Sequence, residues 1–266
     1  MKTRTIQLCL VFLLACQITC YGAEPVHEQV HELRVAVGLR LAPYVLETSV
    51  GGVEYEYVSA IMSQLGYTLH PHFMSLDLIV DEVRSGRADM ALTIKPEMVP
   101  GMAVSHPYVT YRNAAINLAS RNLTIDTMQD LKHYSVAAFA NAKLYLGPEF
   151  AATVAGKQDY QEYANQLAQN AALYKSEVDV VVMDVNIFSY LDASITHAKI
   201  ATIAPVSLHE IFPANQYCIA FRDPAIRDLF DKQLAHAKSL PEYKTIKERW
   251  QARIAQPLDS VLLGGK

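Results

Sequence analysis

The chain has few cysteines and no strong excess of either charge, and both absences restrict its function. Three of its four cysteines lie within the first twenty residues, so a protein that loses this segment keeps only Cys218 and cannot form an internal disulfide. With 23 basic and 27 acidic residues, the formal net charge is -4 at pH 7. This balance gives no support for nucleic-acid binding, which requires a basic face.

Several other signatures are also missing. The sequence has no internal repeat, no low-complexity stretch, no P-loop and no His-Glu-x-x-His motif. His27 and His31 stand four residues apart, and His70 and His72 alternate along an expected strand, but solvated histidines explain both pairs better than a zinc site does. We therefore expect no cofactor, no metal and no nucleic-acid partner.

The N-terminus has the pattern of an export signal. Lys2 and Arg4 precede an apolar run over residues 6–15, which has the length of a signal-peptide core but is too short to span a membrane. We expect a signal peptide over residues 1–23 and a periplasmic location. Residues 13–16 (LLAC) also fit a lipobox, so an alternative is a lipid anchor on Cys16.

The remainder of the chain alternates between strand and helix patterns. A helix is expected over residues 53–65, where apolar residues recur at helical spacing and stop at Gly66. Alternating strands and helices at this interval predict an α/β fold with largely parallel sheets. Further strands are expected at 33–37, 67–73, 89–94, 114–119, 134–139, 178–183 and 216–221, and further helices at 76–84, from about 142, at 158–169, 187–191, 225–239 and 241–255.

Two segments resemble a known family. Residues 86–98 (GRADMALTIKPEM), followed at family spacing by residues 105–108 (SHPY), resemble the family 3 bacterial extracellular solute-binding proteins, the amino-acid receptors of ABC importers; residues 243–250 echo the family's closing signature. The resemblance implies a two-lobed, type II periplasmic-binding-protein-like α/β fold with two crossing strands. Lobe 1 would comprise residues 30–112 and 216–258, and lobe 2 residues 113–215.

The resemblance also implies a ligand site between the lobes. Asp184 matches the family aspartate that receives the ligand's ammonium group, although it could instead cap the helix that follows. Tyr44 lies where the family places an aromatic ring over the ligand, and it could equally cover a core. Thr93 and Ile94 would offer backbone groups to the ligand.

Two positions depart from the family pattern. Met98 stands where the family has an arginine that binds the ligand's carboxylate, and Asn141 lies in place of a Gly-Thr turn. Lys95 is a candidate replacement cation, with Arg40 and Arg112 as rivals. We therefore expect standard amino acids to bind weakly and the ligand to be polar and amino-acid-like or amine-bearing.

We expect a monomeric solute-binding protein, with no catalysis, that serves an ABC permease or a membrane sensor. One alternative is an enzyme on the same scaffold, resembling cyclohexadienyl and arogenate dehydratases, with Glu149 or Glu177 as the acid. The other is a binding module that has no small ligand.

Overall fold

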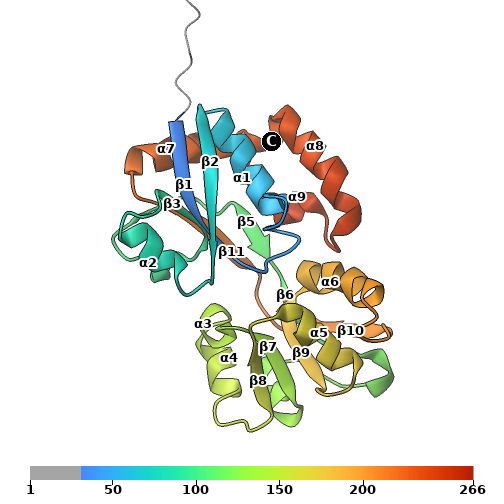
Figure 1. The fold of residues 1–266 in the computed structure, drawn as a ribbon. Helices are drawn as coiled ribbons and strands as arrows, with labels where there is room; N and C mark the ends of the chain where they lie inside the picture. Colours follow the sequence, from blue (N-terminus) through green and yellow to red (C-terminus); the bar gives the residue numbers. More distant parts are fainter. Residues whose placement is uncertain (1–30, 266) are drawn as a thin grey trace, which may run out of the picture.

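The computed structural model describes residues 31–265 and contains two sheets, one in each of two lobes (Figure 1). The expected signal peptide and Cys16 lie outside the described residues. No helix within residues 31–265 has both the length and the hydropathy needed to cross a membrane.

The sheet of lobe 1 is built from both ends of the described chain. Its strand order is β2-β1-β3-β11-β4, and β5 pairs with β11. β1 is parallel to β2 and β3, whereas β11 is antiparallel to β3. The strands are β1 (His31–Gly38), β2 (Tyr67–Met74), β3 (Met90–Ile94), β4 (Ala103–Val104), β5 (Val109–Tyr111) and β11 (Asn215–Phe221).

Within residues 31–265, five α-helices belong to this lobe. α1 carries its buried residues at the helical spacing expected from the sequence, and it packs against α8 (Figure 1). Trp250, at the end of α8, is 1% exposed, and its indole donates a hydrogen bond to Glu56 of α1. The helices are α1 (Val53–Ser63), α2 (Ile79–Arg84), α7 (Pro224–Leu234), α8 (Pro241–Trp250) and α9 (Leu258–Val261).

Lobe 2 has a second mixed sheet, in the order β10-β6-β9-β7-β8. β7 is parallel to β8 and β9, and β6 is antiparallel to β9. Its strands are β6 (Asn113–Leu118), β7 (Val136–Phe139), β8 (Tyr160–Tyr163), β9 (Val180–Asp184) and β10 (Val206–His209), and its helices are α3 (Ala142–Tyr145), α4 (Pro148–Thr153), α5 (Gln166–Tyr174) and α6 (Val185–His197).

One expected helix is wrong. The segment 158–169 contains strand β8, and helix α5 begins only at Gln166. β8 is the last strand of its sheet and pairs with β7 alone, so most of its side chains are only half-buried. The polar residues Gln161 and Glu162 therefore suit an edge strand, although they resemble an amphipathic helix in the sequence.

The lobes are linked by two chain crossings. β5 in lobe 1 runs through Arg112 directly into β6 in lobe 2, and β11 returns beside β5, with Asn215 opposite Tyr111. The last described residues also belong to lobe 1, because Leu258, Val261 and Leu262 are fully buried in its core. Lobe 1 thus continues past residue 258, the end proposed from the sequence.

Candidate ligand site between the lobes

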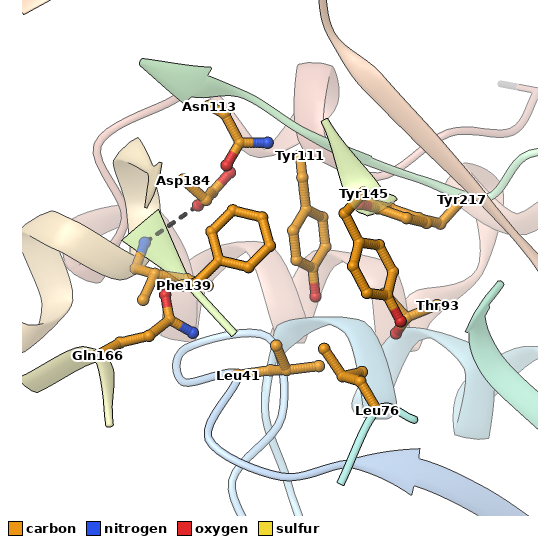
Figure 2. A pocket seen from close by; sticks show the side chains of 11 residues that line it. Leu41, Leu76, Thr93, Tyr111, Asn113, Phe139, Tyr145, Gln166, Asp184 and Tyr217 are labelled. Carbon is orange, nitrogen blue, oxygen red and sulfur yellow. Dashed lines mark hydrogen bonds between the residues drawn. The ribbon is translucent and has the colours of Figure 1, made fainter. Parts of the chain in front are cut away.

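A cavity lies where the two lobes meet (Figure 2). The space inside it that water can enter is about 40 Å³, and the cavity opens to solvent. Lobe 1 contributes Leu41, Leu76 and Thr93, lobe 2 contributes Phe139, Tyr145, Gln166, Asp184 and Ile187, and the crossing segments contribute Tyr111, Asn113 and Tyr217.

Side chains of each lobe donate hydrogen bonds to the opposite lobe across the cleft. The Lys95 ammonium donates to the Tyr145 carbonyl at 2.6 Å and to the Asn215 side chain at 3.1 Å. At the cavity mouth, the Gln166 amide donates to the Arg40 carbonyl at 3.2 Å. Burial lowers the pKa of Lys95. These contacts describe a closed arrangement of the lobes.

Asp184 lies in the cavity wall and also caps a helix. One carboxylate oxygen accepts from the backbone amides of Asn186 and Ile187 at 2.9 and 3.0 Å, at the start of α6. The other oxygen accepts from the Arg112 backbone amide at 2.8 Å, and the Tyr44 hydroxyl lies 3.1 Å from both oxygens. The helix-cap interpretation of Asp184 is therefore realised in the structure, and the same carboxylate lines the cavity.

Tyr44 lies behind the cavity wall. Its side chain is fully buried and stacks on Tyr111, with 3.7 Å between ring centroids. The Tyr44 hydroxyl donates to Asp184 and accepts from the Asn186 side chain, which in turn accepts from the backbone amide of Gln256. This hydrogen-bonded chain joins lobe 1 to helix α6 of lobe 2.

Glu54 is a buried carboxylate that the sequence analysis missed. It lies in the first turn of α1 with no exposed surface. The hydroxyls of Tyr108, Tyr111 and Thr93 donate to it, the last two at 2.6 and 2.8 Å. Burial raises the pKa of Glu54, although these hydrogen bonds oppose the shift. Glu56 in the same turn gives the same sequence signal, so periodicity alone could not single out Glu54.

The other expected site residues lie at different depths. Thr93 lines the cavity, whereas Ile94 is buried in the core of lobe 1. Met98 is half-buried in a short 3₁₀-helix (Pro96–Met98) and is not among the lining residues. Asn141 does not line this cavity but a second pocket that shares Leu41 and Gln166 with it, and the Asn141 backbone amide donates to Glu162 at 2.8 Å.

Three polar groups in the cavity wall have no hydrogen-bond partner within residues 31–265: the Asn113 amide and the hydroxyls of Tyr145 and Tyr217. Asn113 is 6% exposed, and Tyr145 and Tyr217 are each 4% exposed. Polar groups that reach the open space of a cavity without a protein partner are available to a polar ligand. The sequence did not indicate a ligand-site role for any of the three, because the apolar residues around them predict only that they are buried in a core.

Two lobes with mixed sheets, crossing strands and a cavity between them define a type II periplasmic binding protein. The model for family 3 of the bacterial extracellular solute-binding proteins matches residues 33–253, and the chain belongs to this family. The family and the fold expected from the sequence are thus confirmed.

Solved structures agree with this assignment. An ancestral arginine-binding protein bound to glutamine is 23% identical, with a TM-score of 0.64 over 82% of this chain and 97% of that one. A histidine kinase sensor domain with similarity to periplasmic binding proteins is 16% identical, with a TM-score of 0.68 over 88% and 99%. A Streptococcus pneumoniae ABC uptake transporter substrate-binding protein with bound histidine is 16% identical, with a TM-score of 0.66 over 85% and 95%. No curated protein sequence matches the chain.

Asp184 should make stability fall as pH rises. Burial raises the pKa of Asp184 to about 6, so between about pH 4 and 6 the native state holds the proton more tightly than the unfolded chain does. The contribution of Asp184 to the free energy of unfolding is then highest below pH 4 and decreases through pH 6, by about 2–3 kcal/mol. Chemical unfolding at a series of pH values measures this effect. We expect the free energy of unfolding of the wild type minus that of Asp184→Asn to decrease as pH rises.

Asp89, whose pKa is lowered and not raised, provides the control. Hydrogen bonds from Arg34 lower the pKa of Asp89, so its contribution is present at neutral pH and lost as pH falls. The difference between wild type and Asp89→Asn should therefore increase with pH. The same slope for both variants would contradict the assignment of a raised pKa to Asp184.

Proposed function

We propose that this protein captures a small polar solute, amino-acid-like or amine-bearing, in the cavity between its lobes. Outside the inner membrane it presents the closed complex to an ABC permease or a membrane sensor. The observation that carries the proposal is the set of polar groups on Asn113, Tyr145 and Tyr217 that have no hydrogen-bond partner within residues 31–265 and line the cavity between the lobes. Closure of two lobes around a ligand is a recurring means of capture.

Proteins of similar structure serve both transport and sensing. The transporter protein with bound histidine and the kinase sensor domain share the fold, so both delivery and sensing are consistent with it. The enzyme alternative receives less support, because Glu149 and Glu177 are both exposed and do not line the cavity. The carboxylate in the cavity wall is Asp184, whose oxygens already accept four hydrogen-bond donors.

A thermal-shift panel of amino acids and small amines tests the proposal. A ligand at a hundred times its Kd stabilises the folded protein by about 2.7 kcal/mol. We expect at least one compound to produce such a shift and Leu41→Trp, which fills the cavity, to abolish it. Leu144→Trp is the control, since Leu144 is 65% exposed and lies outside the cavity. A shift that survives Leu41→Trp would place the ligand elsewhere.

A further inference from the structure

Four aromatic rings form a continuous arc in the cavity wall. Tyr111 and Tyr217 have centroids 5.1 Å apart, Tyr217 and Tyr145 6.5 Å, and Tyr145 and Phe139 6.3 Å. All four residues line the cavity, and Figure 2 shows their rings around it. The faces of aromatic rings attract cations, and such cages suit ammonium groups whose charge is covered by methyl groups.

The carboxylate beside these rings has no remaining acceptor site. A carboxylate has about four lone-pair sites. At Asp184, the oxygen at the helix cap accepts from the backbone amides of Asn186 and Ile187, and the other accepts from the Arg112 backbone amide and the Tyr44 hydroxyl. Asp184 can therefore supply negative charge to a ligand, but not a further hydrogen bond to an ammonium N–H. A cation without N–H groups has no hydrogen-bond donor that would stay unsatisfied beside Asp184.

The two ends of the cavity differ in charge. Asp184 and Asn113 lie at one end, and Tyr145, Tyr217 and Thr93 at the other (Figure 2). Beyond this second end the Lys95 ammonium lies 5.8 Å from the Tyr217 ring centroid. Together with the free tyrosine hydroxyls, it favours an oxygen atom of the ligand there, such as that of a hydroxyl or a carboxylate.

We infer that the cavity selects a small methylated onium compound that carries an oxygen function, with its cationic group beside Asp184, against the rings of Tyr111 and Phe139, and its oxygen towards Tyr145 and Tyr217. This inference names the ligand class of the solute-binding function proposed above and therefore rests on it. It replaces the sequence-based expectation that Asp184 takes up the N–H donors of an ammonium group.

Calorimetric titration with matched compounds tests the inference. Choline and glycine betaine represent the proposed class, 3,3-dimethylbutan-1-ol is the uncharged isostere of choline, and ethanolamine is its N–H-bearing analogue. We expect choline or glycine betaine to bind at least tenfold more tightly than the isostere and than ethanolamine. Equal binding of the isostere, tighter binding of ethanolamine, or no binding of either onium compound would each overturn the inference.

Three variants separate the aromatic face, the hydroxyl and the charge. Tyr217→Phe removes a hydroxyl that faces the ligand's oxygen and should retain the preference for the cation over its isostere. Phe139→Leu removes an aromatic face and no polar group, and should reduce the affinity for choline or glycine betaine at least tenfold. Asp184→Asn keeps an oxygen at the helix cap but removes the charge, and should weaken the cation without affecting the isostere. A choline affinity unchanged in both Phe139→Leu and Asp184→Asn would contradict the arrangement.

The binding results distinguish a wrong ligand class from a wrong proposed function. If the onium compounds do not bind but a standard amino acid does, and Leu41→Trp abolishes its binding, the ligand class is wrong and the solute-binding function stands. If neither the onium compounds nor any member of the amino-acid and amine panel binds, the proposed function falls as well.

Discussion

Replacing Glu54 by alanine should lower the free energy of unfolding by about 3–5 kcal/mol. The change leaves a cavity and removes the acceptor of three buried hydroxyls, on Tyr108, Tyr111 and Thr93. An unsatisfied buried polar group costs about 1–3 kcal/mol, and losses above about 4 kcal/mol arise from such broken networks. Chemical denaturation monitored by circular dichroism measures the loss.

Two variants serve as controls for this effect. Glu97→Ala makes the same chemical change at an exposed position and should shift stability by about 0.5 kcal/mol or less. Glu54→Gln keeps the shape and one carbonyl acceptor, so it should cost less than Glu54→Ala. If Glu54→Ala were as mild as Glu97→Ala, the three hydroxyls would not depend on this carboxylate.

Asn113→Leu should weaken ligand binding without destabilising the protein. The Asn113 amide has no hydrogen-bond partner within residues 31–265, so leucine, of similar size, removes an unsatisfied polar group from a 6% exposed position. An amino acid or amine of the panel loses its hydrogen bonds to the amide, which corresponds to about a tenfold to hundredfold loss in affinity, whereas an onium group without N–H makes no such bonds. Calorimetry with the best panel compound, together with denaturation, measures both effects.

Asn117 on the same strand, β6, provides a matched control. It is fully buried, but its side chain donates to the Leu118 carbonyl and contacts the His209 ring at 2.7 Å. Asn117→Leu should therefore destabilise the protein and leave affinity unchanged, the opposite of the result expected for Asn113→Leu. Destabilisation by both variants with no change in affinity would remove Asn113 from the site.

The sequence allowed the fold to be predicted because its strongest signals are local. The helical spacing up to Gly66 predicted α1, and the motif over residues 86–98 located β3 and its turn. β8 was missed, since a half-buried edge strand carries polar residues that also fit an amphipathic helix. Local periodicity does not report how many neighbours a strand has.

The site was harder to predict, because burial decides which polar residues take part. Asp184 and Thr93 line the cavity, whereas Tyr44 lies behind Tyr111 and Ile94 is buried in the core. Nothing in the strand pattern around Tyr217 shows that its hydroxyl meets open space. That property depends on side chains from both lobes that lie far apart in the sequence.

The central claim is that a solute binds between the lobes and holds them closed. Leu78 and Leu144 are exposed and lie on different lobes, so the variants Leu78→Cys and Leu144→Cys provide sites for two spin labels. A Cys218→Ala background prevents labelling of the cysteine within residues 31–265. Pulsed electron resonance measures the distance between the labels with and without the panel compound of largest thermal shift. The account predicts a narrower distribution at shorter distance when the compound is bound. Identical distributions in the free and the saturated protein would contradict it.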